Sequence, residues 1–377
     1  PSRAGSQSPP MSESEKPSRR GLLIAGAGAL AACSPEPRPG GGPALITQPR
    51  VMWRLASSFR SNLAAMHGAA VRLSQRVEAA TEGRFTLRVH QADELLPSLA
   101  VLDAVQKGSV EAGQTAGYYY MGKDPALAFE TGVPFGLTPR QQQAWLHEAG
   151  GLALLRERYA RFGVINFPAG NTGVQMGGWF NRPVRSRTDL RGLKMRIPGL
   201  GGRVMDSLGV LVQNLPGGEI YPALERGAID ATEWVGPFDD EKLGFYKVAR
   251  FYHYPGWWEP GPELSILVNR AAFEALPRGY QQIFEAAVRD AGAYMQQRYD
   301  AENPAALERL RQQGIELVPF SRDLLDAAKQ ASEGLLDAEA DQDPGLRRIL
   351  EHWREFRQRS FAWFGLAERA YAEFSFH

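Results

Sequence analysis

Apolar and polar residues follow two different spacings in the first part of the folded chain. Residues 51–55 form a short apolar run suited to a buried strand, and residues 63–80 carry apolar side chains three and four positions apart, as on one face of a helix. Gly83 would end this helix, and residues 85–89 alternate as a second strand. A strand, a helix and a strand in this order predict an α/β fold.

The same alternation continues through the middle of the chain. The expected helices cover residues 99–107, 202–208 and 221–226, and the expected strands or apolar segments cover residues 110–116, 163–167, 193–197, 210–212 and 228–234. Repeated units of this kind predict parallel sheets rather than sandwiches or bundles. Residues 322–374 keep a helical spacing with few glycines, so we expect helices that pack across the body of the protein.

The first 50 residues have a different pattern. Residues 1–10 precede Met11 and look like translated upstream sequence, and Arg19-Arg20 stands before an uncharged apolar stretch, residues 21–32. A basic flank before a short apolar segment is the layout of a secretory signal, and paired arginines resemble a twin-arginine export signal. We therefore expect a periplasmic protein.

Cys33 follows Leu30-Ala31-Ala32, which resembles a lipoprotein cleavage box. Lipid attached to Cys33 would anchor the mature protein to a membrane surface, whereas a plain signal would leave this cysteine incidental. Residues 34–49 are rich in proline and glycine and read as a flexible tether. Residues 1–50 are thus expected to be upstream residues, signal peptide and tether.

Length and charge narrow the class of protein. A chain of 377 residues exceeds the size of one hydrophobic core, about 250–300 residues, so two lobes are expected. Lysine and arginine number 43 against 42 aspartate and glutamate, spread along the chain, so nucleic acid is not expected as a partner. The single cysteine excludes a disulfide framework.

The sequence offers little for catalysis. The six histidines are isolated from one another, and no GxSxG elbow or phosphate-binding GxxxxGK[ST] motif occurs. Gly199-Leu200-Gly201-Gly202 lacks the third glycine of a dinucleotide site, so we interpret it as a tight turn from a strand to a helix. These features favour a binding protein, and they leave a carboxylate-dependent hydrolase open.

Four stretches together resemble one family. They cover residues 167–180 (FPAGNTGVQMGGWF), 190–197 (LRGLKMRI), 220–234 (IYPALERGAIDATEW) and 254–259 (YPGWWE). They resemble the extracytoplasmic solute receptors of TRAP (tripartite ATP-independent periplasmic) transporters, in the branch that binds 2-oxo and 2-hydroxy monocarboxylates with a metal ion. The resemblance spans roughly Val51 to the C-terminus and implies an α/β, two-lobed periplasmic binding protein with hinge crossovers and long C-terminal helices.

The resemblance also implies an organisation and partners. Lobe I would cover residues 51–173, with 262–301 returning to it; lobe II would cover residues 174–261, with 302–355 returning to it; residues 356–377 would form a C-terminal helix. The receptor would deliver pyruvate, 2-oxobutyrate or lactate to TRAP membrane permease subunits without covalent chemistry. The C-terminal helices can mediate a homodimer in this branch.

Arg196 and Glu233 are the central candidates for binding. A guanidinium at the end of a strand can meet a carboxylate with two parallel hydrogen bonds, and the resemblance assigns Arg196 the carboxylate of the ligand. Glu233 ends an apolar stretch, where a buried carboxylate needs a cation or a metal. Each could instead form a structural ion pair.

Oxygen-bearing residues near Glu233 suggest a cation site. Gln175 offers an amide oxygen and Trp234 a peptide carbonyl, which together with a carboxylate are the ligands that hard cations such as sodium or calcium prefer. In the receptors that this chain resembles, these three positions hold the cation that also binds the 2-oxygen of the ligand. Glu259 is a further candidate ligand.

Weaker candidates would line the first-lobe wall. Tyr119 and Tyr120, in the run Tyr118-Tyr119-Tyr120, together with Phe59 and Asn171, suit a small ligand that is part apolar and part polar. Each could equally pack in a core.

Three alternatives remain at this point. The same fold could bind an aromatic acid or a polyol, or it could serve as a sensory module. The chain could also be an exported carboxylate-dependent enzyme with Glu233 and Glu259 as its working pair, which would turn a substrate over instead of binding it.

Overall fold

The computed structural model describes residues 48–376. The described residues do not include the expected signal with its twin arginines, nor Cys33. They include only the last two residues of the expected tether, Gln48 and Pro49. Within the described part of the chain, no helix combines the length and the apolar character needed to cross a membrane.

The first sheet, sheet A, contains five strands in the order β2-β1-β3-β10-β4. Their bounds are β1 (Val51–Ser57), β2 (Phe85–His90), β3 (Ala112–Thr115), β4 (Val164–Asn171) and β10 (Glu263–Asn269). β1 pairs in parallel with β2 and β3, whereas β10 runs antiparallel to β3 and β4. The strands predicted at residues 51–55, 85–89 and 163–167 are confirmed.

The second sheet, sheet B, contains six strands in the order β11-β9-β5-β8-β6-β7. Their bounds are β5 (Trp179–Phe180), β6 (Lys194–Arg196), β7 (Leu211–Gln213), β8 (Ala231–Thr232), β9 (Phe251–Tyr254) and β11 (Glu316–Pro319). β6 is parallel to β7 and β8, and β9 to β11, but β5 is antiparallel to β8 and β9.

The prediction of parallel sheets is therefore wrong in part, because both sheets are mixed. β5 follows β4 of sheet A through residues 172–178, and β10 follows β9 of sheet B through residues 255–262. Neither strand arrives through a helical crossover within its own sheet, which is the connection that produces a parallel neighbour. These two strands are the ones that bring antiparallel pairing into sheet B and sheet A.

Shorter helices accompany each sheet. Those next to sheet A are α1 (Met66–Ala80), α2 (Val101–Gln106), α3 (Ala128–Thr131), α4 (Pro139–His147), α5 (Gly151–Ala160) and α9 (Arg270–Glu274). Those next to sheet B are α6 (Gly199–Ser207), α7 (Gly217–Glu225) and α8 (Pro237–Leu243).

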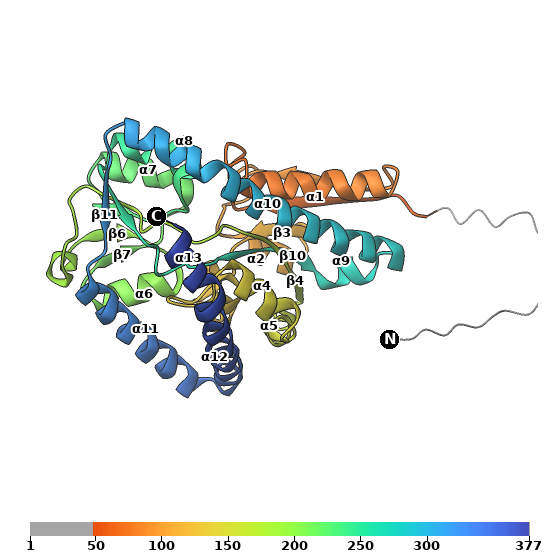
Figure 1. Cartoon of the computed structure of the whole chain (residues 1–377). Coiled ribbons are helices and arrows are strands. Elements are labelled where there is room, and N and C mark those ends of the chain that lie inside the picture. Colours follow the sequence, from red (N-terminus) through yellow and green to blue (C-terminus); the bar gives the residue numbers. More distant parts are fainter. Residues whose placement is uncertain (1–47, 377) are drawn as a thin grey trace, which may run out of the picture. The chain divides into compact units, whose positions relative to one another are not determined.

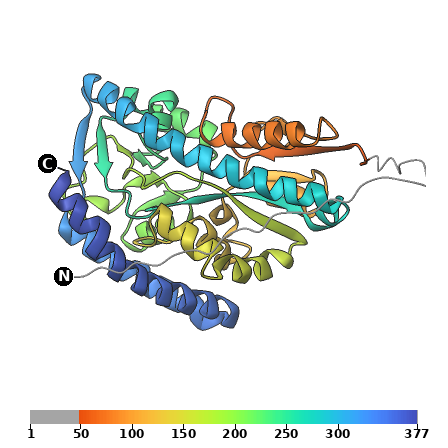
Figure 2. The ribbon, with the colours of Figure 1, turned by 45° about the vertical axis from the view of Figure 1, so that its right-hand side comes forward.

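One long helix, α10 (Arg278–Gln312), runs past both sheets. At a rise of about 1.5 Å per residue its length is roughly 50 Å. It packs against α1 and β4 at one end and against α8 toward the other (Figures 1 and 2). Residues 172–178, residues 255–262 and α10 are thus connections between sheet A and sheet B. The expected lobe boundaries follow these crossings and stay a prediction.

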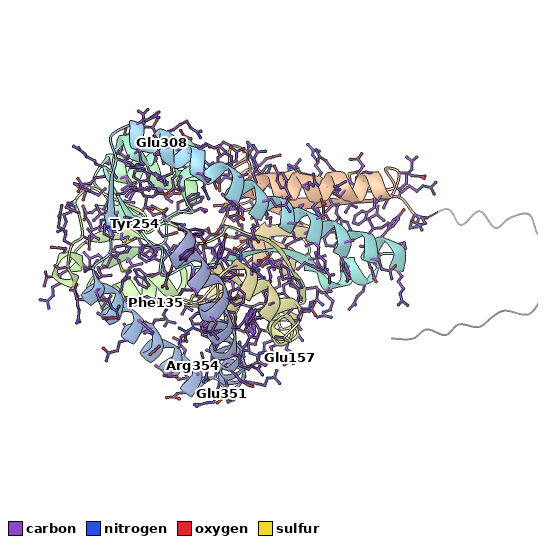
Figure 3. All side chains as sticks on the ribbon, viewed as in Figure 1. Phe135, Glu157, Tyr254, Glu308, Glu351 and Arg354 are labelled. Carbon is purple, nitrogen blue, oxygen red and sulfur yellow. The ribbon has the colours of Figure 1, made fainter. Side chains whose placement is uncertain are left out.

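The final helices confirm the helical spacing of residues 322–374. They are α11 (Arg322–Gln342), α12 (Pro344–Phe364), a π-turn (Gly365–Arg369) and α13 (Ala370–Ser375). Figure 2 shows α11 and α12 side by side in dark blue. Ion pairs tie α12 to its neighbours, through Arg354 and Asp337 of α11 at 2.5 Å and through Arg348 and Glu157 of α5; Arg354 and Glu157 are labelled in Figure 3.

The interpretation of Gly199-Leu200-Gly201-Gly202 as a turn is wrong, because these residues form the first turn of α6. A Cβ on Gly202 would lie 2.5 Å from the carbonyl oxygen of Ile197, and one on Gly201 would lie 2.7 Å from Cβ of Trp258. The glycines therefore let α6 begin directly against the end of β6, next to Arg196.

Candidate functional site

A narrow cavity lies between residues that follow the strands of sheet A and those that follow the strands of sheet B. Its volume is about 10 Å³, which is room for about one water molecule. The residues that line it are Phe59, Met66, Tyr118, Tyr119, Thr172, Gln175, Arg196, Glu233, Trp234, Val235, Glu259, Pro262 and Leu264. Several of them stand at the carboxyl ends of parallel strands, where open α/β sheets place their ligands.

Arg196 is the last residue of β6, and its side chain is only 2% exposed. Its Nε donates to the carbonyl oxygen of Leu215 at 3.1 Å, and its Nη1 donates to the carbonyl oxygen of Glu233 at 3.3 Å and to the Glu233 carboxylate. The guanidinium also lies 5.3 Å from the centre of the Trp234 ring. These contacts fix a buried positive charge in the cavity wall.

Two carboxylates share the cavity with Arg196. Glu233 follows β8, and burial raises its pKa to about 7 against the opposing effect of the Arg196 charge. Glu259 is 4% exposed, and burial together with the negative charge of Glu233 holds its pKa well above the ordinary range. Both shifts record the cost of burying a carboxylate without enough positive charge around it.

Oxygen atoms in the cavity wall lack hydrogen-bond partners. They are Oε1 of Gln175 and Oε2 of Glu259, and both are buried. The amide nitrogen of Gln175 donates to Oγ1 of Thr172 at 3.1 Å, so its oxygen is the atom left for the cavity. Buried acceptors without partners are costly, and a cation would satisfy them.

The donor chemistry fits a hard cation. Carboxylate and amide oxygens are available at Glu233, Glu259 and Gln175, and the peptide carbonyl of Trp234 follows Glu233 directly. Among residues 48–376 no group of three or more His, Cys, Asp or Glu side chains converges on one point. The cavity would therefore supply a cation with at most two charged side chains, and a bound acid would have to provide the remaining oxygens.

The structure brings most of the predicted site residues together. Arg196, Gln175, Glu233, Trp234 and Glu259 all line the cavity. The weaker candidates Phe59 and Tyr119 line it as well, on the side of sheet A.

Tyr120 and Asn171 do not line the cavity. The hydroxyl of Tyr120 lies 2.9 Å from Oγ1 of Thr115 and accepts from the amide of Leu102, so its ring belongs to a core beside sheet A. The side chain of Asn171 donates to the carbonyl oxygen of Gly261 at 2.9 Å and accepts from the amide of Gly173. Both residues have a structural role, because their polar atoms are already engaged.

Sequence reasoning did not single out several residues of the cavity. Tyr118 points into it while Tyr120 does not, because Gly117–Tyr120 form one 3₁₀ turn that directs successive side chains differently. The apolar residues Met66 and Leu264 also line it. Their apolar character alone predicts burial in any core, so no signal in the sequence could have assigned them to a site.

Asp240 stabilises a turn next to the cavity. Its Oδ1 accepts from the amides of Val235 at 3.4 Å and Gly236 at 3.2 Å, and its Oδ2 accepts from Nε1 of Trp179 at 2.9 Å and from the hydroxyl of Tyr252 at 2.7 Å. The carboxylate thus fixes the turn that directly follows Trp234.

Comparisons with known proteins agree on the type of protein. The sequence model of the family described as "Bacterial extracellular solute-binding protein, family 7" matches residues 56–343. The monocarboxylate 2-oxoacid-binding periplasmic protein of Nostoc sp. (strain PCC 7120) is 54% identical over 327 residues, which are 87% of this chain and 90% of the Nostoc protein.

Solved structures are similar in fold as well. A TRAP transporter solute-binding protein of Bordetella bronchiseptica RB50, a mixed-occupancy dimer with copurified calcium and picolinate, is 44% identical, with a TM-score of 0.86 over 87% of this chain and 98% of that one. A TRAP periplasmic solute-binding protein of Pseudoalteromonas atlantica T6c, with sodium and pyruvate, is 38% identical, with a TM-score of 0.84 over 86% and 99%.

Proposed function

The chain belongs to family 7 of the bacterial extracellular solute-binding proteins, and on that premise we propose that it is the solute receptor of a TRAP transporter that captures a small 2-oxo or 2-hydroxy monocarboxylate with a cation. Pyruvate, 2-oxobutyrate and lactate are the candidate ligands. The observation that carries this proposal is the buried guanidinium of Arg196 in a cavity that also holds two carboxylates and an unpartnered amide oxygen.

Arg196 and the cation would bind different parts of the ligand. The planar guanidinium would take the carboxylate of the ligand, and this requires the side chain of Glu233 to exchange its direct bond with Arg196 for a bond to the cation. A sodium or calcium ion would be held by Gln175, Glu233, the carbonyl of Trp234 and Glu259, and it would supply the charge that binds the carboxylate and the 2-oxygen of the acid. A fatty acid without an oxygen at carbon 2 would leave one position on the cation unfilled.

The cavity has to widen to admit any acid, because its present volume holds about one water molecule, and a short acid requires the least widening. Aromatic rings and apolar side chains on the side of sheet A leave little space beyond the polar end. An aromatic acid is the second candidate, since the Bordetella bronchiseptica relative holds picolinate. A polyol fits less well, because it has no carboxylate to pair with Arg196 when Glu233 turns to the cation. A carboxylate-dependent enzyme would need Glu233 to be free for proton transfer, whereas here it is bound to Arg196.

Titration calorimetry tests the proposal. The purified protein is titrated with pyruvate, lactate, 2-oxobutyrate, picolinate and a polyol, before and after chelator treatment and in sodium-free buffer. We expect one-to-one binding of the 2-oxygenated acids that depends on the cation and is lost in Arg196→Met and Glu233→Ala. Binding of picolinate alone would support the receptor function but contradict the proposed class of ligand. Turnover of any acid would contradict the receptor function.

To deliver the acid, the receptor must be located outside the cytoplasm and must bind a membrane partner. The family is extracellular, and we propose TRAP permease subunits as the partner, with export through Arg19-Arg20 and lipid attached to Cys33. Labelled palmitate incorporated into the wild type but not into Cys33→Ala would support the lipid anchor. Secretion of Arg19→Lys, Arg20→Lys at the level of the wild type would contradict the export route.

We also propose that the C-terminal helices mediate a homodimer, since their apolar side chains are exposed. The exposed residues are Phe361, Trp363, Leu366, Tyr371, Phe374 and Phe376. Trp363, Leu366 and Phe374 lie in α12, the π-helical segment and α13, and a second copy of the chain would cover them. Light scattering should give a dimer for the wild type and a monomer for Trp363→Glu, whereas Leu95→Glu, at an exposed leucine far along the chain, should not change the mass.

A further inference from the structure

Phe135 connects the loop between α3 and α4, residues 132–138, to the connection between β9 and β10. Its amide donates to the carbonyl oxygen of Trp257 at 2.7 Å, and its ring stacks on the Trp257 ring, with the ring centres 5.0 Å apart and the planes inclined by 13°. Its backbone is left-handed, with φ at 55°. A residue with a bulky side chain adopts this conformation only where surrounding contacts hold it there.

Arg357 of α12 supplies a contact of this kind. Its Nε and Nη2 donate to the carbonyl oxygen of Phe135 at 3.2 Å and 2.9 Å. The guanidinium lies 4.6 Å from the centre of the Phe361 ring and 5.5 Å from a ring centre of Trp353, and burial lowers its pKa. A half-buried guanidinium thus holds the backbone of the loop at its left-handed residue.

Gly136 lets the loop approach α12 this closely. A Cβ at this position would lie 2.9 Å from Cζ2 of Trp353 and 2.5 Å from the carbonyl oxygen of Val133. The contact between Phe135 and α12 therefore depends on a glycine directly after Phe135.

The helix α12 is also held at a second place. Arg354, one turn before Arg357, forms an ion pair with Asp337 of α11; Arg354 and Phe135 are both labelled in Figure 3. Because this pair ties α12 to α11, loss of the hydrogen bonds from Arg357 should release the loop at Phe135 more than the helix.

The connection between β9 and β10 extends from Trp257 to the cavity. The amide of Gly256, next to Trp257, donates to the carbonyl oxygen of Gln175 at 2.9 Å, and the amide of Gln175 donates to the carbonyl oxygen of Glu259 at 3.2 Å. A Cβ on Gly256 would lie 2.6 Å from the carbonyl oxygens of both Gln175 and Met176, so the two segments are in close contact. The side chains of Gln175 and Glu259 line the cavity, so a shift of Trp257 should move part of its wall.

We infer that Arg357 is a positioning residue for the ligand cavity, although it is not among the residues that line it. By holding Phe135 it fixes Trp257, and the connection between β9 and β10 then keeps Gln175 in place. The inference rests on the proposed function, because the affinity for the ligand is one of its readouts. It adds to that function a route by which α12 affects binding.

Hydrogen exchange followed by mass spectrometry and titration calorimetry test the inference. Arg357→Met keeps an apolar side chain against Trp353 and Phe361 and removes both hydrogen bonds to Phe135. We expect amides within residues 255–259 and 172–178 to exchange at least fivefold faster in the unliganded variant. The dissociation constant for pyruvate, measured with Na⁺ and Ca²⁺ present, should rise at least fivefold. Arg357→Lys, which can keep one hydrogen bond, should recover part of both effects.

Arg354→Met is the matched control on the same helix. It removes the ion pair with Asp337, so it should lower thermal stability without changing either readout. A change as large as that in Arg357→Met would mean that any weakening of α12 has this effect, and it would overturn the inference. Unchanged exchange or unchanged pyruvate affinity in Arg357→Met would overturn it as well.

Phe135→Gly tests the same route from the loop. Glycine adopts the left-handed backbone without strain and keeps the main-chain hydrogen bonds, so this variant should fold, but it loses the ring that stacks on Trp257. It should also weaken pyruvate binding, and its combination with Arg357→Met should weaken binding by less than the product of the two single effects. The full product would show that the two residues act independently and would contradict the inference.

Failure of the proposed function gives a different result. If the wild type binds no pyruvate, the proposed ligand is wrong, and the exchange rates of residues 172–178 alone decide the inference. Faster exchange there in Arg357→Met than in Arg354→Met would support it, and equal exchange in the two variants would overturn it.

Discussion

Arg196 and Glu233 are linked through both backbone and side chains at the ends of neighbouring strands. The amide of Glu233 donates to the carbonyl oxygen of Arg196 at 3.2 Å, Nη1 of Arg196 donates to the carbonyl oxygen of Glu233 at 3.3 Å, and the two side chains form a buried ion pair. The parallel pairing of β6 with β8 sets this register, with Arg196 opposite Thr232. The pair forms without a ligand, so in the proposed function a ligand carboxylate would have to compete with Glu233 for the guanidinium.

Arg196→Lys separates charge from geometry. The lysine keeps a positive charge next to Glu233, so the protein should remain folded, but it cannot form two parallel hydrogen bonds with a carboxylate. We expect the affinity for pyruvate to fall at least tenfold, which is about 1.4 kcal/mol of binding free energy. Titration calorimetry measures the affinity, and Arg54→Lys at an exposed ion pair provides the control. Unchanged affinity in Arg196→Lys would mean that the ligand does not meet the guanidinium.

Asp240 should act on the cation through the turn after Trp234. In Asp240→Asn the amide nitrogen would face Nε1 of Trp179 and the hydroxyl of Tyr252, so one buried donor loses its acceptor, at a cost of about 1–3 kcal/mol in the free energy of unfolding. The oxygen that remains in this variant is uncharged and accepts more weakly from the amides of Val235 and Gly236, so the turn should loosen, the Trp234 carbonyl should move and cation affinity should fall as well.

Tyr252→Phe is the matched control for this prediction. It removes one hydrogen bond to Asp240 and leaves the two bonds to the turn in place. Thermal unfolding should show a loss of stability in both variants, whereas calcium titration should show weaker binding only in Asp240→Asn. Equal calcium affinity in the two variants would limit Asp240 to a structural role.

The fold was predictable where local signals agree with the tertiary structure. The first strands of sheet A and the C-terminal helices follow clear apolar spacing, and the structure has them where expected. The directions of β5 and β10 were not predictable, because they depend on connections that leave one sheet for the other. The 35-residue helix α10 was also missed, although its buried residues from Tyr280 to Leu310 follow one helical face, because Pro304 inside this segment argues against a continuous helix.

The site was predictable where its residues carry chemistry. Arg196 and Glu233 stood out as charged groups within apolar stretches, Gln175 was indicated by its amide oxygen and by the resemblance to the family, and the structure brings all three to one cavity. Tyr118 and Tyr120 could not be told apart, because the 3₁₀ turn decides which ring faces the cavity. Leu264 could not be recognised, because a leucine in a strand looks the same whether it faces a ligand or a core.

His253 should make stability depend on pH. Its ring packs against Phe180 and Phe320, its Nε2 accepts from the amide of Val184 at 3.2 Å, and burial, helped by the charge of Arg185, lowers its pKa to about 4. In the unfolded chain the pKa is about 6.5. Between these values the unfolded state binds a proton that the folded state does not, so stability falls as the pH falls.

The expected contribution of His253 is about 2 kcal/mol of stability lost between pH 7 and pH 5. Denaturant unfolding at several pH values measures it, with His253→Gln as the variant that cannot titrate. Carboxylates contribute in both proteins to the change of unfolding free energy with pH. The effect of His253 is therefore the difference between the wild-type and His253→Gln curves of unfolding free energy against pH. Parallel curves for wild type and His253→Gln over this range would show that His253 titrates normally in the folded protein.

Leu264 should limit the length of the acid. It lies at the start of β10 and lines the apolar side of the cavity with Phe59 and Met66, where carbon 3 and any further carbons of the acid would lie. Leu264→Ala opens space there, so longer 2-oxo acids should gain affinity relative to pyruvate. Each buried methylene contributes about 0.8 kcal/mol, so one or two accommodated methylenes should raise the relative affinity by up to roughly tenfold. The substitution should also lower the free energy of unfolding by about 2–5 kcal/mol.

Leu267→Ala separates specificity from stability. Leu267 is on the same strand and fully buried, but it packs in the core with Val101 and Val105, away from the cavity. Both variants should lose similar stability, and only Leu264→Ala should change the ratio of affinities for pyruvate and a five-carbon 2-oxo acid in calorimetry. If the two variants change this ratio equally, the effect comes from a general loosening of sheet A; if neither changes it, the ligand does not reach the wall that Leu264 forms.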